Sequence, residues 1–435
     1  MDDQRHRPVT RHYPAPVNHI INDPTPKDQA IYIPSVSPGY AQAAYAQAWK
    51  RPLPRGVQPG DLNFLDPDNR LFHISHVMTS AGQALKQTKD CIITQRDRAA
   101  TMLICDSGGY QIANRNMPIN GDRDRMRILR WMEQHGDLGM TLDVPTGKAG
   151  LHDYRFKSSE DCLRATLEHL DFFQRHRVPG KIRLLNVLQG NTLVQTDTWY
   201  EAVKDYAFEG WAFAGKLRHN IHAFIRRIFI MERDGLIQDR DWIHVLGTCE
   251  LDTAVLLTAL QRAINRHLNP RLRISFDTST PFRALAFGNI YTVPTFGRRE
   301  MTMPMRRMPD SDAFIGSDVR WPWPSPLGDR MALGDVCVDA SPLANSTYDT
   351  QSNHYVAHHN LAALCWAVAL ANRVFDGESL DHQHTIGHGE GQVVELIDRV
   401  FASSSMAELD SYARTFARLR HGKLEDTGDE DRAVT

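Results

Sequence analysis

Residues 182–277 contain four short apolar runs, IRLLNVLQG (182–190), GWAFAG (210–215), WIHVLG (242–247) and RISFD (273–277). Each run ends in a small or polar residue, and two similar runs precede them, TMLICD (101–106) and GMTLD (139–143). Runs of this length and composition are typical of strands that are buried on both faces of a parallel sheet.

Segments of helical character separate these runs. Clear examples are residues 123–136, 158–176 and 251–268, the last with apolar residues at spacings of three and four. Alternation of strands and helices implies a parallel sheet covered by helices. Because at least six such units follow one another in one region, we expect an irregular (β/α)8 barrel of the TIM type rather than an open sheet.

The chain is longer than one barrel requires. It has 435 residues, whereas a barrel of this kind needs roughly 250, so we expect an N-terminal extension and an insertion after the last strand. Residues 1–27 are rich in Pro, His and charge and predict a flexible arm. Residues 28–375 form the expected barrel, including an insertion at 291–350 that is rich in Pro, Met and Arg, and residues 376–435 form a helical segment and an acidic tail.

Composition sets limits on location and partners. The formal net charge is only −2, so binding to nucleic acid would need a local basic face. The six cysteines form no CxxC pair, which favours a reducing, cytoplasmic setting. The first ten residues lack the apolar core of a secretory signal, and the apolar stretch LAALCWAVALA (361–371) is too short to cross a bilayer. We therefore expect a protein with no membrane partner.

Polar or small residues follow the predicted strands where the strands end. In a (β/α)8 barrel the carboxyl ends of all strands converge on one pocket, so residues far apart in sequence become neighbours there. The alternative for any single aspartate is that it caps the following helix. Six such positions together favour a shared site: Asp106, Asp143, Gln189, Gly215, Gly247 and Asp277.

The segment DSGGYQ (106–111) resembles the DSGG(F/Y)Q motif of the tRNA-guanine transglycosylases, which exchange guanine for a 7-deazaguanine on an irregular (β/α)8 barrel. The resemblance covers residues 103–283 well, extends loosely to about residue 373, and is poor before residue 90. Further segments similar to family motifs follow in the family's order: LDVPT (142–146), VLQG (187–190), FAGKL (213–217), VLGT (245–248) and FDTSTPFR (276–283).

The resemblance implies catalytic roles for two aspartates. Asp277 matches the family's nucleophile, with Phe276, Pro281 and Arg283 in register. A carboxylate that attacks a glycosidic carbon forms a covalent glycosyl enzyme, which a second nucleophile, here the incoming base, then releases. Asp106 matches the general acid/base that would protonate the leaving guanine and later accept a proton from its replacement.

The same resemblance implies a base-binding pocket. Asp143 would accept hydrogen bonds from guanine N1 and the exocyclic amine, while Gln189 and the backbone at Gly215 would read O6. Tyr110 would stack on the base with Leu246 as the opposite wall, and Gly108 and Gly109 would let the backbone approach the ligand. The alternatives are that Tyr110 is a core residue and that Gln189 is a satisfied amide at a strand end.

The sequence departs from the family at its zinc site. Typical members carry CxCxxC and a later histidine, but here Asp339 and Pro342 replace the second and third cysteines after Cys337. His359 matches the histidine position, so Cys337 and His359 are the remaining candidate ligands, with His354 or His358 as further candidates in an unusual site. We expect that no cofactor is required and that the structural zinc is lost.

Basic residues alternate with tryptophans in and around the insertion. Such a pattern suits contacts to phosphates and stacking on bases, and the alternative is a solvated, Pro-rich loop. Arg226 and Arg227 are weaker candidates for the same face. The predicted nucleic-acid contacts are Arg283, Arg298, Arg299, Arg306, Arg307, Arg320, Trp321 and Trp323.

The first hypothesis is a pentosyltransferase that exchanges guanine in a polynucleotide for a free 7-deazaguanine base, working as a monomer or homodimer. Because the N-terminal third and the zinc region diverge, the chain is more similar to the DNA 7-deazaguanine transglycosylase branch, whose incoming base resembles preQ0, than to the enzymes that act on tRNA. The other hypotheses are a non-catalytic nucleic-acid-binding partner subunit and an unrelated barrel hydrolase with two carboxylates. Retention of both Asp106 and Asp277 argues against the partner subunit, and the Gly-Gly-Tyr-Gln continuation argues against the hydrolase.

Overall fold

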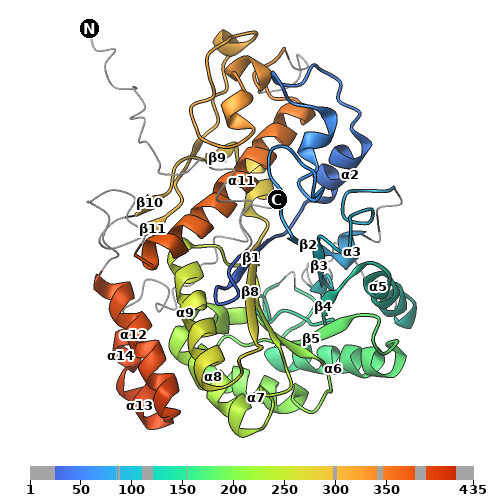
Figure 1. Ribbon diagram of the computed structural model, residues 1–435. Coiled ribbons are helices and arrows are strands. Elements are labelled where there is room, and N and C mark those ends of the chain that lie inside the picture. The colour runs from blue at the N-terminus through green and yellow to red at the C-terminus, as the bar shows by residue number, and fades with distance from the viewer. Residues whose placement is uncertain are drawn as a thin grey trace.

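The computed structural model of the protein describes residues 25–84, 86, 89–109, 121–152, 154–296, 301–339, 346–377 and 388–417. Eight strands form one parallel sheet that is nearly closed into a barrel, in the order β1-β8-β7-β6-β5-β4-β3-β2 (Figure 1). The Val36 N–H donates to the Met78 carbonyl at 2.9 Å beside the gap between β1 and β2. The strands are β1 (Ile31–Pro34), β2 (His76–Ser80), β3 (Met102–Asp106), β4 (Leu138–Met140), β5 (Arg183–Leu188), β6 (Gly210–Phe213), β7 (Trp242–Val245) and β8 (Arg273–Thr278).

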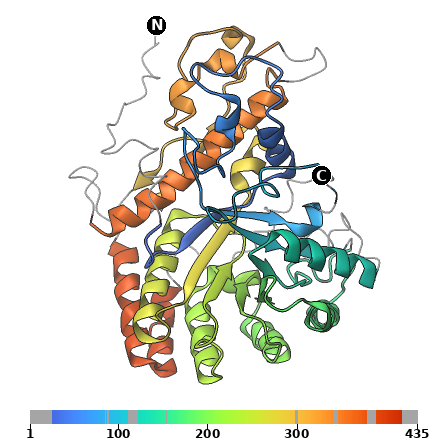
Figure 2. The same ribbon diagram turned by 45° about the vertical axis from the view of Figure 1, so that its right-hand side comes forward.

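This architecture confirms the predicted (β/α)8 barrel. The six runs recognised in the sequence form β3 to β8, and the extension before residue 90 supplies β1 and β2, which the sequence analysis did not identify. Helices follow the strands and cover the outside of the barrel (Figure 2). They are α3 (Ala81–Ala84), α5 (Asp122–His135), α6 (Ser159–His176), α7 (Leu193–Val203), α8 (Ile221–Arg233), α9 (Leu251–His267) and α10 (Thr280–Arg283).

Side-chain caps determine where several helices begin. Ser158 accepts a hydrogen bond from the Asp161 N–H at the start of α6, and Thr192 does the same for the Gln195 N–H at the start of α7. These bonds satisfy backbone donors that have no partner within the helix. Thr192 comes soon after β5, which ends at Leu188, whereas a longer connection joins β4, which ends at Met140, to the cap at Ser158.

The barrel interior is a packed apolar core that is separate from the layer between sheet and helices. Parallel strands place alternate side chains on one face, so inward positions recur every second residue. The interior cluster consists of Ile31, Ile33, Met78, Ile104, Leu138, Met140, Leu185, Val187, Ala212, Ala214 and Trp242, with Met102 and Leu246 packed against it.

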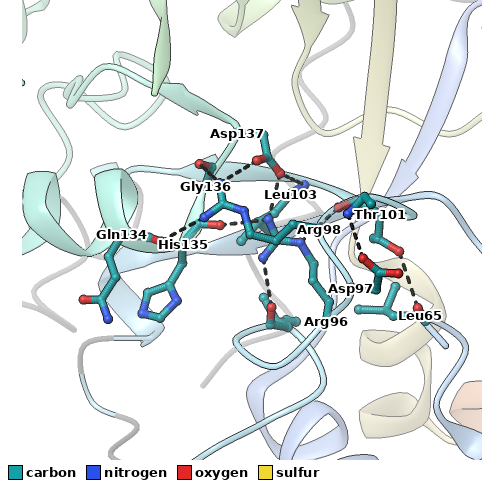
Figure 3. A network of polar contacts seen from close by, with 12 residues as sticks. Leu65, Arg96, Asp97, Arg98, Thr101, Leu103, Gln134, His135, Gly136 and Asp137 are labelled. Carbon is teal, nitrogen blue, oxygen red and sulfur yellow. Dashed lines mark hydrogen bonds and ion pairs between the residues drawn. The ribbon is translucent and has the colours of Figure 1, made fainter. Parts of the chain in front are cut away.

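A network of arginines fixes the amino ends of β3 and β4 (Figure 3). Asp137 precedes β4 and accepts hydrogen bonds from the Leu103 N–H at 2.8 Å, from Arg96 at 2.7 Å and from Arg98 at 2.7 Å. The Arg96 side chain is only 1% exposed and also donates to the carbonyls of Ile93, Thr101 and His135. The network holds two neighbouring strands at the end opposite to Asp106.

The insertion after β8 and the N-terminal extension lie side by side at one end of the molecule (Figures 1 and 2). Arg51, which follows α2, donates to Asp349 at 2.8 Å and to the Asp335 carbonyl at 3.1 Å. In the described residues of the insertion, the strands are two or three residues long. These elements are α2 (Pro38–Ala46), β9 (Asn289–Tyr291), β10 (Thr295–Phe296), β11 (Met301–Thr302) and β12 (Met305–Arg307).

A long helix, α11 (Thr350–Phe375), follows the insertion. The C-terminal segment forms α12 (His388–Ser403), α13 (Met406–Ser411) and α14 (Ala413–Phe416), of which α12 packs against α9 (Figure 1). Within the described residues, no helix combines the length and hydropathy that crossing a membrane requires.

Candidate active site at the carboxyl end of the barrel

The alternation of inward side chains brings four predicted site residues to one end of the barrel interior. Asp106 continues the inward series of Met102 and Ile104 in β3, and Gln189 continues the series of Leu185 and Val187 in β5. By the same two-residue period, Leu246 follows β7 on the inward side, and Asp277 follows Ser275 in β8. These four positions are Asp106, Gln189, Leu246 and Asp277.

Asp277 is 7% exposed and is held by donors from β7 and the turn after it. Its Oδ1 atom accepts a hydrogen bond from the Gly247 N–H at 2.8 Å and lies 3.2 Å from His244 Nε2. The Asp277 carbonyl also accepts from the Thr248 N–H at 2.8 Å. The nucleophile candidate is therefore fixed through both its backbone and one of its carboxylate oxygens.

Asp106 accepts hydrogen bonds from the Gly108 backbone and the Ser80 side chain, and Ser80 is its register partner on β2. Burial, together with the nearby charge of Asp277, raises the pKa of Asp106 to about 6, although the hydrogen bonds from Gly108 and Ser80 oppose this rise. A carboxyl group with a pKa near neutrality can both donate and accept a proton, which is what general acid/base chemistry requires.

Asp143 and Gln189 form a buried pair at the ends of neighbouring strands. Gln189 Nε2 donates to Asp143 Oδ2 at 2.7 Å, and the side chains are 5% and 6% exposed, respectively. Burial raises the pKa of Asp143 to about 7, the Gln189 hydrogen bond opposes this rise, and the charge of Asp106 adds to it. Asp106 therefore lies near enough to both Asp143 and Asp277 for their charges to interact.

Two glycines allow the strand-end loops to approach one another closely. A Cβ atom at Gly109 would lie 2.2 Å from the Asp143 carbonyl oxygen and 3.1 Å from its Oδ1. Gly215 has a φ of +60°, and a Cβ there would lie 2.6 Å from the Gly190 carbonyl oxygen. Any larger residue would push these loops apart, so the close packing of the loops requires glycine at both positions.

Leu246 is half-buried and packs at the edge of the interior cluster. Its carbonyl accepts a hydrogen bond from Arg218 at 3.0 Å, which links the loops after β6 and β7. Tyr110, the predicted stacking residue, lies outside the described residues. The stacking of a base between Tyr110 and Leu246 stays a prediction.

The predicted nucleic-acid contacts have different surroundings. Arg283, Arg306, Arg307 and Arg320 are exposed, whereas Arg298 and Arg299 lie outside the described residues. Trp321 is 6% exposed, and its ring packs 5.2 Å from that of Trp323 and 5.4 Å from that of His359. In this structure Trp321 is a core residue of the insertion, Trp323 is partly exposed, and their contact with nucleic acid stays a prediction.

The expectation that Arg226 and Arg227 extend the basic face is wrong. Both arginines form ion pairs with Asp197. The distance from Arg226 to the carboxylate is 2.7 Å, and Arg227 contacts the same oxygen. Arg227 is only 2% exposed and its guanidinium lies over the Tyr200 ring. These arginines join α8 to α7 instead of offering charge to a ligand.

The two remaining candidate zinc ligands bond to other protein groups. Cys337 Sγ donates to the Pro309 carbonyl at 3.1 Å. His359 Nδ1 lies 2.7 Å from Ser325 Oγ, and its Nε2 lies 3.1 Å from the Tyr291 carbonyl oxygen. Across the ranges that the structure describes, His, Cys, Asp and Glu side chains form no group of three or more that could hold a metal. Cys337 and His359 thus have other partners in this structure, and the loss of the structural zinc stays a prediction.

Three polar residues of this site were missed in the sequence: Ser80, His244 and Ser275. Ser80 lies on β2, which was not recognised as a strand, and contacts Asp106. His244 and Ser275 stand two residues before Leu246 and Asp277 within apolar runs. The two-residue period could have placed them in the barrel interior, where a polar side chain needs a partner.

No family model matches the chain, and no curated protein matches it either.

Proposed function

We propose that this protein is a transglycosylase that replaces guanine in DNA by a 7-deazaguanine base through a covalent intermediate on Asp277. The observation that carries the proposal is the common site of three carboxyl groups: the charge of Asp277 raises the pKa of Asp106, and the charge of Asp106 raises that of Asp143. The motif resemblance supports the same assignment of roles. In this assignment one carboxylate attacks the sugar, a second serves as the general acid/base, and the third recognises the base.

In the first half-reaction, a carboxylate oxygen of Asp277 forms a bond to the anomeric carbon of the target nucleotide. The glycosidic C–N bond breaks, and its electron pair leaves with the guanine, which takes a proton from Asp106. The second half-reaction reverses these events: Asp106 accepts the proton of the incoming base, whose nitrogen displaces Asp277. The overall exchange retains configuration because the anomeric carbon is attacked twice.

The Asp143 and Gln189 pair suits recognition of guanine. An ionised Asp143 would accept hydrogen bonds from guanine N1–H and the exocyclic amine, and the second Nε2 hydrogen of Gln189 would reach O6. Adenine presents the opposite pattern of donors and acceptors and would leave these buried groups without partners, which is costly. Guanine and 7-deazaguanines share the same Watson–Crick edge, with N1–H, the exocyclic amine and O6. One pocket would therefore serve the leaving and the incoming base.

The exposed arginines after β8 support a polynucleotide substrate. Arg283 lies six residues after Asp277 on α10, and Arg306, Arg307 and Arg320 follow in the insertion. Exposed arginines in the segments that follow the nucleophile strand would suit phosphate contacts on either side of a nucleotide that has been flipped out of a duplex.

Exchange of labelled guanine tests the proposal. The protein is incubated with radiolabelled guanine and either duplex DNA or tRNA, and radioactivity in the recovered polymer is measured, with Asp277→Asn as the matched control. We expect incorporation into DNA that the control abolishes. Incorporation into tRNA alone would reassign the substrate, and no incorporation into either polymer would reject base exchange.

A further inference from the structure

A column of four polar side chains runs along the inside of the barrel and ends at Asp277. Trp242 Nε1 donates to Ser275 Oγ at 2.8 Å, and Ser275 Oγ lies 2.8 Å from His244 Nδ1. His244 Nε2 in turn lies 3.2 Å from Asp277 Oδ1. Ser275 and His244 are both 0% exposed, and Trp242 is 6% exposed. The column runs beside the apolar cluster of the barrel interior, of which Trp242 is itself a member.

The direction of the hydrogen bonds in this column follows from what each group can donate. The indole N–H of Trp242 is only a donor, so Ser275 Oγ must accept from it. Within the described part of the chain, the Ser275 hydroxyl has one remaining partner, His244 Nδ1. The hydroxyl hydrogen therefore points to Nδ1, which must be unprotonated, and the imidazole carries its hydrogen on Nε2, facing Asp277.

We propose that His244 is a positioning residue that holds Asp277 Oδ1 as a neutral Nε2–H donor, so that Oδ2 is the oxygen that attacks the sugar. Two donors occupy Oδ1, His244 Nε2 and the Gly247 N–H. In the part of the chain that the structure describes, Oδ2 accepts no hydrogen bond. This inference rests on the proposed function, because it assumes that Asp277 is the nucleophile.

The same two donors serve both half-reactions. When the bond between Oδ2 and the anomeric carbon forms, Oδ1 becomes the carbonyl oxygen of the ester and keeps both hydrogen bonds. When the incoming base displaces Asp277, the electron pair of the breaking bond returns to the carboxylate, whose charge the donors stabilise. A neutral imidazole can do this without delivering a proton to the leaving carboxylate.

Two substitutions separate the donor to Asp277 from the contact with Ser275. Glutamine can place its amide nitrogen near the position of Nε2, whereas asparagine reaches only the position of Nδ1. We expect His244→Asn to lower the single-turnover rate of glycosyl-enzyme formation by about 10- to 100-fold, the effect of one hydrogen bond to a charged group. His244→Gln should restore most of this rate, and neither variant should change the KM for the incoming base.

The tautomer can be measured on the unaltered protein without any substrate. Nitrogen-15 NMR of histidine-labelled protein distinguishes the two neutral tautomers and the imidazolium, and the His244 signals are identified by their loss from either variant. We expect unprotonated Nδ1 and protonated Nε2 at pH 7. In Ser275→Ala, which removes the hydroxyl that donates to Nδ1, a share of the Nδ1–H tautomer should appear.

The outcomes distinguish this inference from the proposed function. Equal rates of adduct formation in His244→Asn and His244→Gln, or an Nδ1–H tautomer or imidazolium in the unaltered protein, would overturn the role of His244 and leave base exchange intact. Absence of exchange in the unaltered protein would instead reject the proposed function, whatever the tautomer. The expected tautomer together with rescue by glutamine supports the inference.

Discussion

Gln189 Nε2 donates a hydrogen bond of 2.7 Å to Asp143 Oδ2, which joins the ends of β5 and β4 into one buried polar unit. Burial raises the pKa of this carboxyl group to about 7. The ionised form is the one that can accept hydrogen bonds from guanine N1–H and the exocyclic amine. Recognition of the base should therefore depend on pH near neutrality.

We predict that affinity for guanine is constant above pH 7 and falls by up to tenfold for each pH unit below it, because protonated Asp143 loses an acceptor. Calorimetric titration with 9-methylguanine between pH 5.5 and 8.5 measures this. Asp143→Asn should bind weakly with a much flatter pH dependence. An affinity that does not change with pH in the unaltered protein would contradict the assignment.

The raised pKa of Asp143 also affects folding. Its folded-state pKa is about 7 against a usual 3.8, so folding favours the protonated form and stability is lost as pH rises through about 7. Asp143→Asn removes this penalty and should stabilise the protein at pH 8 by up to about 4 kcal/mol, with little gain at pH 4. Urea unfolding at the two pH values tests this, and equal destabilisation at both would disprove it.

The arginine network at the amino ends of β3 and β4 should be a main source of stability (Figure 3). The Arg96 side chain is only 1% exposed, and Asp137→Asn leaves it without a carboxylate partner. This substitution should lower the free energy of unfolding by about 3–5 kcal/mol. The control is Asp122→Asn, because the Asp122 side chain is 73% exposed in its ion pair with Arg125. This substitution should lower the free energy of unfolding by less than about 1 kcal/mol. Similar losses of unfolding free energy in both variants would contradict the importance of the network.

Hydrogen bonds and arginines hold the pKa of Asp137 below its usual value although burial opposes them. The stability that this carboxylate contributes is therefore present above about pH 3.8 and is lost as pH falls through its lower folded-state pKa. As the pH is lowered into the acid range, the free energy of unfolding should therefore fall less steeply in Asp137→Asn than in the unaltered protein.

Most of the barrel could be predicted from the sequence because β3 to β8 are apolar runs separated by amphipathic helices. The strands β1 and β2 could not, since IYIP (31–34) ends in proline, a residue that argues against a strand, and HVMTS (76–80) is partly polar. Their identity as strands depends on pairing with β8 and β3. Such long-range pairing has no local signature in the sequence.

Only part of the candidate site could be predicted from the sequence. Asp106, Gln189 and Asp277 stand where their strands end, so their convergence follows from the barrel itself. His244 and Ser275 are hidden inside apolar runs, and Arg227 has the sequence context of a surface helix but is only 2% exposed. Whether an arginine meets a ligand or a neighbouring aspartate is decided by packing between helices.

The general acid can be tested with a base that leaves without a proton. A 7-methylguanine in DNA already carries a positive charge and departs as a neutral molecule. Asp106→Asn should form the glycosyl enzyme at least tenfold more slowly than the unaltered protein on guanine, because the leaving base lacks its proton donor. On 7-methylguanine the same variant should react nearly as fast as the unaltered protein, and failure of this rescue would contradict the acid role of Asp106.

The measurement that tests the covalent mechanism most directly is mass mapping of the trapped intermediate. The protein is incubated with guanine-containing duplex DNA, denatured, and digested with nuclease and trypsin. The tryptic peptide ISFDTSTPFR (274–283) contains Asp277 as its sole carboxylate side chain. We predict a nucleotide adduct on this peptide that disappears when free guanine is added before denaturation. An adduct on a peptide containing Asp106, or base exchange with no adduct on residues 274–283, would contradict the account.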